Sequence, residues 1–292
     1  MKILITGGNG FLGSNLALAL LSQEHDISLL LRPASSLIRF GEELKYFTLG
    51  YCENDNDISN FIKLVSPDIV IHAAASLGRN NESLLELYDT NYRFGLSVLQ
   101  CISLINKHVY FININTALDA QLNLYTYTKH SFANMGKMIA KKFPDRISFI
   151  NILMQIIYGP GDNKSSFVTK IINDCKSNQE ELQLTAGIQN RDFIFIEDAT
   201  SAYMSIIKNI KNLENVMDID VGSGKTITIK EFVETVHRLS KSSIDLNFGA
   251  LPFRKLEPMN SQANIIKLQS FGWKQEYSIE AGIIKILDQM VK

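Results

Sequence analysis

Short apolar segments alternate with longer amphipathic segments along the first half of the chain. The apolar runs KILIT, ISLLL, IVIHAAA, VYFINI and ISFINIL begin at residues 2, 27, 69, 109 and 147. Between them, residues 11–23, 83–105 and 125–143 carry apolar residues at helical spacing. Nearly continuous apolar strands separated by helices are typical of a parallel sheet covered on both faces. The pattern predicts an α/β fold, a doubly wound parallel sheet of the Rossmann type.

The rhythm changes after the segment YGPGD at residues 158–162. More polar residues follow, and the apolar runs FIFIE at 193–197 and MDIDV at 217–221 stand as isolated strands. We expect a Rossmann domain over residues 1–157 and a smaller α+β substrate lobe over 158–292, with residues 190–222 partly returning to the first domain. Because open α/β sheets bind ligands beyond the carboxyl ends of their strands, we expect the smaller lobe to lie there.

Composition and charge exclude several classes of function. The chain has 29 Lys and Arg against 30 Asp and Glu without a long run of one sign, so no nucleic-acid partner is expected. Three widely spaced cysteines form no C-x-x-C pair and the five histidines have no metal-like spacing, which predicts neither a disulfide framework nor a metal site. Glycines interrupt the apolar start too early for a membrane span or a secretory signal. We therefore expect a cytoplasmic protein with no membrane partner.

A glycine-rich turn, GGNGFLG, follows the first predicted strand and opens a helix. A diphosphate needs close backbone N–H groups at a helix N-terminus, and glycines at these offsets allow that approach. The context within a βαβ unit predicts dinucleotide binding, whereas a merely tight turn is the alternative. The expected cofactor contacts from this turn are Gly7, Gly10, Phe11, Leu12 and Gly13.

The end of the second predicted strand decides between NAD and NADP. The chain there reads LLRP at residues 30–33, without the carboxylate that holds the 2′-hydroxyl of NAD. Arg32 instead offers a guanidinium to a 2′-phosphate, and Ser35, Ser36 and Arg39 follow it. We expect NADP(H) as the cofactor; the alternative is that Arg32 is only a solvated charge at a strand end.

The stretch YTYTK at residues 125–129 combines two tyrosines with a lysine. Residues i and i+4 share a helix face, so Tyr125 stands with Lys129 while Tyr127 points elsewhere. An ammonium beside the phenol, with a positive nicotinamide, should bring the phenol pKa toward the working range, and the lysine can also bond the nicotinamide ribose. We predict that Tyr125 and Lys129 are catalytic; a plain surface helix is the alternative.

A hydroxyl stands just beyond the strand that begins at residue 109. Thr116 can hydrogen-bond a substrate carbonyl opposite the tyrosine, although Asn113 and Asn115 compete for the same role. His72, inside an apolar strand, is expected to be a core residue rather than a base.

Together these features resemble the extended short-chain dehydrogenase/reductase family, in its nucleotide-sugar branch. The motifs that carry the resemblance are TGGNGFLG, HAAA at 72–75, Asn91 in TNY, the set of Thr116, Tyr125 and Lys129, YGPGD, RDFIFIED and VGSG. Within the branch the chain is most similar to CDP-paratose and CDP-abequose synthases, through GRNNES at 78–83, LYTYTK and AGIQNRDF.

The resemblance implies NADPH-dependent reduction of the 4-keto group of a nucleotide-activated deoxyhexose, for O-antigen and lipopolysaccharide synthesis. Family dehydratases carry Asp-Glu after the catalytic threonine, but Ala117 and Leu118 stand here, which disfavours dehydration. Arg32 disfavours an NDP-sugar 4-epimerase with bound NAD, which is the nearest alternative; a non-catalytic dinucleotide-sensing protein is another. The sequence leaves open CDP or dTDP, the deoxygenation of C3 and the C4 configuration of the product.

The family also assigns further residues. It implies cofactor contacts from Ala73, Ala74, Ala75 and Asn91, and a homodimer that packs helices including the one with Tyr125.

For the substrate, it implies that Arg191 and Arg254 bind the diphosphate and that Arg79 and Asn80 face the sugar. Alternatively, Arg191 pairs with Asp192 or Asp198, and the others are solvated charges or turns.

Overall fold

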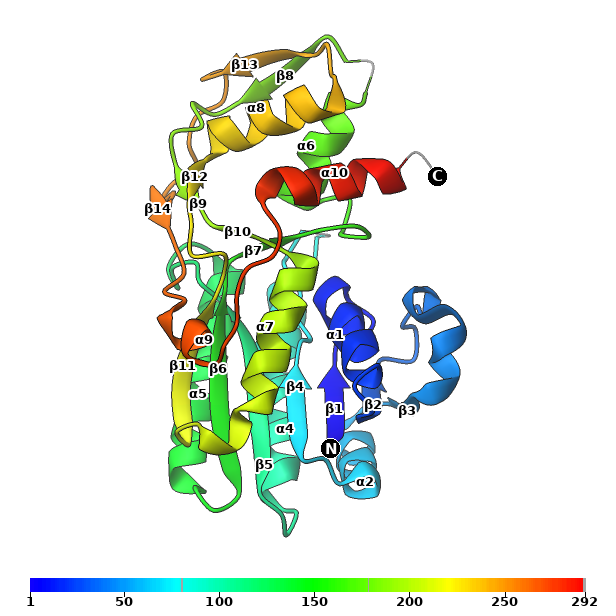
Figure 1. Ribbon diagram of the computed structural model, residues 1–292. Helices are drawn as coiled ribbons and strands as arrows, with labels where there is room; N and C mark the ends of the chain where they lie inside the picture. Colours follow the sequence, from blue (N-terminus) through cyan, green and yellow to red (C-terminus); the bar gives the residue numbers. More distant parts are fainter. Residues whose placement is uncertain (80, 178, 291–292) are drawn as a thin grey trace. The chain divides into compact units, whose positions relative to one another are not determined.

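The computed structural model describes residues 1–79, 81–177 and 179–290 (Figure 1). In this part of the chain the main sheet has the strand order β11-β6-β5-β4-β1-β2-β3. Every pair in it whose register is described is parallel. The order reverses beside β1, where a doubly wound sheet has its switch point. The predicted Rossmann-type fold is thus confirmed, with strands β1 Lys2–Thr6, β2 Asp26–Leu31, β3 Thr48–Tyr51, β4 Ile69–His72, β5 Val109–Thr116, β6 Ile147–Met154 and β11 Val216–Val221.

Helices connect these strands and cover both faces of the sheet. In Figure 1, α1 lies in front of the sheet, and α4 and α5 lie behind it. The helix expected over 83–105 consists of three segments: α3, a π-helical turn η2 and α4. Single π-helical turns occur frequently at functional sites. The helical segments here are α1 Phe11–Leu21, η1 Ile38–Tyr46, α2 Asp55–Val65, α3 Leu84–Tyr88, η2 Asp89–Arg93, α4 Phe94–Ser103 and α5 Leu124–Lys142.

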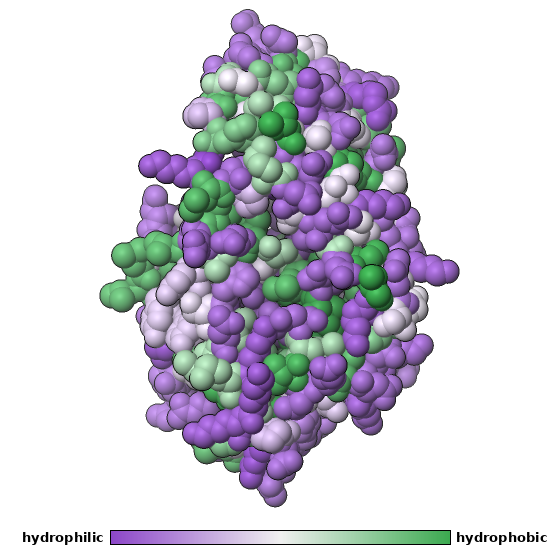
Figure 2. All heavy atoms as spheres, turned by 90° about the vertical axis from the view of Figure 1, so that its left-hand side faces the viewer, coloured by the Kyte–Doolittle hydropathy of each residue, from purple (hydrophilic) through white to green (hydrophobic). Residues whose placement is uncertain are grey.

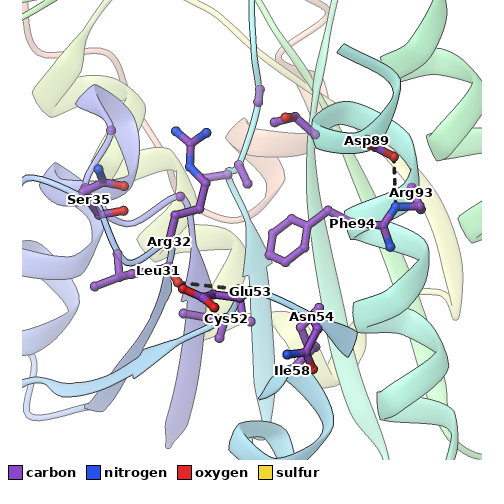
Figure 3. Close-up of a pocket in the computed structure, with 18 of the residues that line it drawn as sticks. Leu31, Arg32, Ser35, Cys52, Glu53, Asn54, Ile58, Asp89, Arg93 and Phe94 are labelled. Atoms are coloured by element: carbon purple, nitrogen blue, oxygen red, sulfur yellow. Dashed lines mark hydrogen bonds and ion pairs between the residues drawn. The ribbon is translucent and has the colours of Figure 1, made fainter. Parts of the chain in front are cut away.

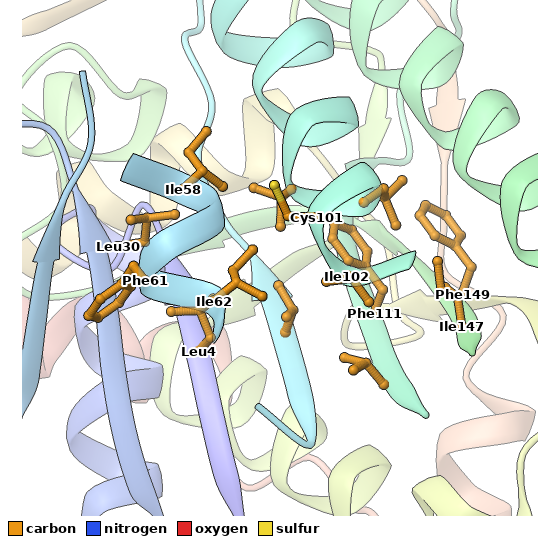
Figure 4. Close-up of a cluster of buried hydrophobic side chains, with 14 of the residues drawn as sticks. Leu4, Leu30, Ile58, Phe61, Ile62, Cys101, Ile102, Phe111, Ile147 and Phe149 are labelled. Atoms are coloured by element: carbon orange, nitrogen blue, oxygen red, sulfur yellow. The ribbon is translucent and has the colours of Figure 1, made fainter. Parts of the chain in front are cut away.

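One aromatic cluster fixes α5 against the sheet. Phe111 of β5 and Phe149 of β6 stack with ring centroids 5.4 Å apart, and Phe132 of α5 packs edge-on against both. At Gly136 a Cβ would lie 2.2 Å from the Phe149 ring, so only glycine lets α5 come this close. The cluster continues to Leu4 and to α2 and α4 (Figure 4). Each fully buried phenylalanine contributes roughly 1.5–3 kcal/mol, and the packing holds the first turn of α5 in place.

Two compact units are distinguished within the chain. The first comprises residues 1–116, 123–153 and 203–219, and the second comprises residues 117–122, 154–202 and 220–292. The division into domains at residue 157 stays a prediction. The remaining elements are β7 Ile156–Tyr158, α6 Phe167–Cys175, β8 Glu181–Leu184, β9 Asn190–Arg191, β10 Phe193–Phe195, α7 Ile196–Lys208, η3 Ile210–Asn212, β12 Ile227–Thr228, α8 Ile229–Ser240, β13 Asp245–Phe248, β14 Asn260–Ser261, α9 Ile266–Ser270 and α10 Ile279–Gln289.

Three details differ from the sequence-based expectation. The run MDIDV is β11 and joins the seven-stranded sheet instead of standing alone. The run FIFIE is a strand only to Phe195, because α7 begins at Ile196. Strand β3, Thr48–Tyr51, was not anticipated, since only Gly50 among its four residues is buried and its pattern carries little signal.

No helix within the described ranges has both the length and the apolar character that crossing a bilayer requires.

Candidate active site

The glycine turn between β1 and α1 touches the segment that follows β4. Gly7 has φ +66°, and a Cβ on it would lie 2.5 Å from the backbone nitrogen of Ala74. Gly10 is the N-cap of α1, makes no side-chain capping bond and is followed by no acidic residue in the first turn. Backbone N–H groups of this first turn can therefore receive an anion. A dinucleotide diphosphate fits this cradle, and a side chain at Gly7 would clash with the backbone of residues 73–74 beside it.

A pocket of about 360 Å³ opens at this turn, within the first unit (Figure 3). It brings together six of the predicted cofactor residues: Gly7, Gly10, Arg32, Ala73, Ala74 and Ala75. The other predicted contacts, Phe11, Leu12, Gly13, Asn91 and Lys129, do not line it. The sequence missed residues 52–55 and 89–90 and the pair Arg93 and Phe94, which also line the pocket. Residues 52–55 directly follow β3. Because β3 was not recognised in the sequence, the residues at its carboxyl end were not recognised as pocket residues either.

Two arginines line the pocket in different electrostatic settings. Arg93 donates to Asp89 at 2.9 Å and to Asp55 at 3.4 Å. For Arg32, by contrast, no ion pair is found in the described part of the chain. Figure 3 shows Arg32 extending between Ser35 and Phe94. Among the described residues, Arg93 is thus paired with carboxylates in this pocket, whereas Arg32 forms no ion pair.

The first turn of α5 presents Tyr125 and Lys129. Asn123 caps the helix by accepting a hydrogen bond from the Thr126 backbone nitrogen at 2.9 Å. Lys129 is 1% exposed, and burial lowers its pKa to about 8. Its ammonium has no hydrogen-bond or ion-pair partner among the described residues. A buried cation without a partner is rare, because desolvation of the charge is costly.

Tyr125 differs from the second tyrosine of the motif. It is half-buried, whereas Tyr127 is 61% exposed. Burial raises the pKa of Tyr125 to about 12, and the positive charge of Arg79 partly offsets that rise. The chain by itself thus keeps the phenol protonated at neutral pH. The lowered pKa expected from the sequence is therefore not found in this structure, where Arg79 and not Lys129 is the charge that acts on the phenol.

Asn91, in the π-helical turn, connects the loop after β4 to α5. Its Oδ1 accepts from the Ser76 backbone nitrogen at 2.7 Å, and its Nδ2 donates to the Ser76 carbonyl at 2.8 Å. Nδ2 also donates to Thr128 Oγ1 at 3.2 Å. The Asn91 side chain therefore holds the loop after the pocket-lining alanines against the helix that carries Tyr125.

The three residues near the end of β5 that were candidates for binding the substrate carbonyl differ in their hydrogen bonds. Asn113 donates to Asn151 at 2.8 Å, and Asn115 accepts from the Thr116 backbone nitrogen at 2.9 Å. The Thr116 hydroxyl stays the best candidate because it stands at the carboxyl end of the strand. His72 is fully buried and bonds Thr6 at 2.8 Å, and burial lowers its pKa well below the usual value, as suits a core residue.

The two arginines expected at the substrate diphosphate both contact Glu257 in the second unit. Arg191 pairs with Glu257 and not with Asp192, whose carboxylate accepts backbone N–H groups of Ser223, Gly224 and Ala263. No sequence pattern marked Glu257.

Arg79 and Asn80 were expected to face the sugar. Arg79 is exposed and acts electrostatically on Tyr125. Asn80 lies outside the described residues.

Metal sites were not expected, and none of the described His, Cys, Asp and Glu side chains gather in a group of three or more that could hold a metal ion. The three cysteines are free thiols.

Comparisons with known proteins identify the family of this chain. Residues 3–222 match the NAD dependent epimerase/dehydratase family. The CDP-abequose synthase of Salmonella muenchen is 30% identical over 98% of this chain and 97% of its own length.

Two solved structures are similar in fold. The UDP-glucose 4-epimerase of Thermotoga maritima, with UDP-glucose, has a TM-score of 0.86 at 17% identity and full coverage of both chains. The UDP-glucuronic acid 4-epimerase of Bacillus cereus, with UDP-glucuronic acid and NAD, has a TM-score of 0.85 at 23% identity, covering 99% of this chain and 100% of its own. The family match spans most of the chain and the first relative spans nearly all of it, so this protein belongs to the NAD dependent epimerase/dehydratase family, the nucleotide-sugar branch of the extended short-chain dehydrogenases/reductases.

Proposed function

We propose that this enzyme uses NADPH to reduce the 4-keto group of a nucleotide-activated deoxyhexose. CDP-4-keto-3,6-dideoxy-D-glucose is the proposed substrate, and CDP-abequose or CDP-paratose for an O-antigen is the proposed product. The name of the Salmonella relative supports this reaction, and the similarity to that relative extends over almost the whole chain. The observation that carries the proposal is Lys129, a buried ammonium without a partner, one helical turn from Tyr125.

The cofactor, when bound, supplies the hydride. Gly7, Gly10 and the first turn of α1 would hold its diphosphate, and Lys129 would donate hydrogen bonds to its nicotinamide ribose. Tyr125 donates its phenolic proton to the C4 oxygen, and Thr116 donates a hydrogen bond to the same oxygen. Hydride at C4 and a proton at oxygen together convert the carbonyl into a hydroxyl. The charge of Lys129 stabilises the phenolate that remains.

The pKa values of the isolated chain suit the first step of this reduction. Burial raises the pKa of Tyr125 to about 12, so the phenol holds the proton that it must give. With its pKa near 8, most of Lys129 is charged at pH 7. Arg79 opposes the rise caused by burial. The Lys129 ammonium, one helical turn away, is proposed to stabilise the negative charge that develops on the phenol oxygen.

The preference for NADPH rests on Arg32 and Ser35. Both line the pocket, and the β2 end that they follow has no carboxylate to repel a 2′-phosphate. Glu53 also lines the pocket, but it follows β3. A guanidinium and a hydroxyl together suit a phosphate.

The substrate would be held through its diphosphate and its sugar. Arg191 and Arg254 are proposed for the diphosphate, and Arg79 and Asn80 for the sugar.

A homodimer is proposed through the helices near Tyr125. Apolar side chains are exposed on them, namely Leu84, Leu85 and Tyr88 on α3 and Leu124 and Tyr127 on α5. The side of the molecule where α5 lies in Figure 1 shows hydrophobic residues among hydrophilic ones (Figure 2). Such surface can pack against a second copy. Sedimentation equilibrium should give twice the mass of 32.9 kDa, and a monomer at micromolar concentration would contradict it.

The reaction is tested by NADPH oxidation over a panel of 4-keto-6-deoxy and 4-keto-3,6-dideoxy sugar nucleotides with CDP and dTDP. NMR of the product gives the C4 configuration and hence abequose or paratose. The Tyr125→Phe variant should bind cofactor and lose turnover by about 10²-fold or more. Bound NAD that survives gel filtration, with turnover that needs no NADPH, would instead indicate a 4-epimerase. Absence of turnover with every sugar nucleotide would favour a non-catalytic protein.

A further inference from the structure

The carboxylate of Glu257 lies between two arginines of the second unit. Its Oε1 accepts a hydrogen bond from Arg191 Nη2, and its Oε2 accepts one from Arg254 Nε. Arg254 Nη2 also lies 3.5 Å from Oε1. The side chains of Arg191 and Glu257 are only 4% and 10% exposed, whereas Arg254 is 55% exposed. One carboxylate thus joins a buried guanidinium to an exposed one.

The buried end of this chain of contacts is fixed. Arg191 Nη1 donates to the Asn190 carbonyl at 2.7 Å. Its strand, β9, pairs with both β12 and β14. The next residue, Asp192, is fully buried and accepts four hydrogen bonds from Ser223, Gly224 and Ala263. Because the Arg191 side chain is buried, bonded to the Asn190 carbonyl and carried by a strand paired on both sides, we infer that it sets the orientation of the Glu257 carboxylate.

The exposed end of the contacts is directed by Glu257. A guanidinium is planar and offers its donors along separate edges. The edge of Arg254 with Nε and Nη2 faces Glu257, so its Nη1 side is turned away from that carboxylate. A phosphate can accept hydrogen bonds from the edge that remains. An exposed arginine without such a contact samples many rotamers, and ordering it on binding costs affinity.

We propose that Glu257 is a positioning residue for the substrate diphosphate, which acts by holding Arg254 ready to bind it. This role rests on the proposed function, which assigns Arg254 to the diphosphate. A carboxylate by itself repels an anion. Glu257 therefore favours binding only through Arg254, and in the absence of that arginine it should oppose binding. The effect of Glu257 on diphosphate binding should therefore change from favourable to unfavourable when Arg254 is removed. A residue with only a structural role would not show this change of sign.

The experiment is a double-mutant cycle on Glu257 and Arg254, read by calorimetric titration of CDP, with dTDP in parallel. Glu257→Gln keeps one acceptor for Arg191 but places an N–H₂ donor toward Arg254. It should raise the Kd for CDP about 2- to 10-fold, the range for immobilising a long side chain. Arg254→Ala should raise it by at least as much. In the Arg254→Ala background, Glu257→Gln should lower the Kd, because there Glu257 only repels the diphosphate and neutralises Arg191, which is also proposed to bind it.

Turnover provides a second readout. Glu257→Gln should raise KM for the sugar nucleotide and leave kcat nearly unchanged, since the diphosphate is remote from the reacting carbon. The matched control is Glu234→Gln, which removes a carboxylate from an exposed pair with Lys230 at 3.9 Å and should leave the Kd unchanged. Where Glu257→Gln lowers the folded fraction by circular dichroism, Glu257→Asp replaces it, because the shorter carboxylate cannot reach both arginines.

The outcomes distinguish the binding of the diphosphate by Arg254 from the positioning of Arg254 by Glu257. An unchanged Kd in Arg254→Ala, or no binding of either nucleotide by the wild type, would remove the diphosphate role itself. A raised Kd in Arg254→Ala with no change in Glu257→Gln would overturn the positioning role alone. An equal change in Kd on Glu257→Gln in the wild type and in Arg254→Ala would also overturn the positioning role.

Discussion

Two buried cations, one in each unit, have opposite surroundings. Lys129 is 1% exposed and has no hydrogen-bond or ion-pair partner in the described chain, whereas the side chain of Arg191 is 4% exposed and bonds Glu257 and the Asn190 carbonyl. Glu257 opposes the desolvation that lowers the pKa of Arg191, without fully offsetting it. Lys129 costs folding free energy, and a fold keeps such a group when a ligand uses its charge. The comparison separates a buried charge without an ion-pair partner from one that a carboxylate accompanies.

Replacing Lys129 should have the largest effect on activity. Lys129→Met removes the ammonium while filling similar space, so kcat should fall about 10²- to 10⁴-fold. Thermal unfolding should shift upward or stay unchanged, because a buried unpaired charge is lost. Lys137→Met on the same helix, whose lysine pairs with Asp218 at 2.6 Å, is the control and should keep its activity. A clear loss of stability in Lys129→Met would mean that the lysine is structural.

Replacing Arg191 should have the largest effect on stability. Arg191→Met leaves Glu257 buried without its inner partner, so the free energy of unfolding should fall by about 3–5 kcal/mol. Urea denaturation measures this change. The double variant Arg191→Met/Glu257→Met should recover much of the loss, because neither charge is then left unpaired. If the free energy of unfolding falls equally in the single and double variants, the unpaired charge of Glu257 is not the cause of the loss.

The pH dependence of stability should expose the cost of Lys129. Its pKa is lowered from 10.5 to about 8 on folding, so the unfolded chain binds more protons between these values. Stability therefore rises with pH across roughly pH 8 to 10.5, by at most about 3 kcal/mol. Tyr125, with its raised pKa, acts in the opposite direction above pH 10. The free energy of unfolding of Lys129→Met is measured over the same pH range and subtracted from that of the wild type, which leaves the contribution of Lys129. A difference that does not change with pH would show that Lys129 is not buried as a cation.

Arg32 provides the smallest of these effects and tests the cofactor preference. Arg32→Gln should lower kcat/KM for NADPH about 10- to 100-fold and change that for NADH far less, because only NADPH has the 2′-phosphate. Arg39→Gln, an exposed charge that does not line the pocket, is the control. Equal losses with both cofactors would assign Arg32 to folding or to another part of the dinucleotide.

Much of the first unit follows from local pattern. The strands at residues 2, 27, 69, 109 and 147 were predicted because buried parallel strands are apolar along their whole length. The glycine turn was predicted because its backbone geometry needs glycine at Gly7, where φ is positive. In contrast, β3 was missed because its residues are mostly exposed, and the part of the pocket that follows it was missed as well.

Residues of the second unit depend more on contacts between distant segments. Arg191 and Arg254 were singled out from their segments, but Glu257 was not, because a single glutamate in a loop carries no pattern. Its role depends on β9 and β14 lying side by side, which brings residues 191 and 257 together across 66 positions of the chain. Register between short strands is set by tertiary packing rather than by local propensity.

The sequence by itself determined which groups stand on one helix face, Tyr125 with Lys129, because the α-helical period is set by backbone geometry. It also determined where the backbone must approach an anion. Only the tertiary structure decided the charge environment of those groups: that Lys129 is buried without a partner, that Asn91 holds a loop against α5, and that Glu257 lies between two arginines. Solvation and electrostatic energy depend on every neighbouring element, and those neighbours come from remote parts of the chain.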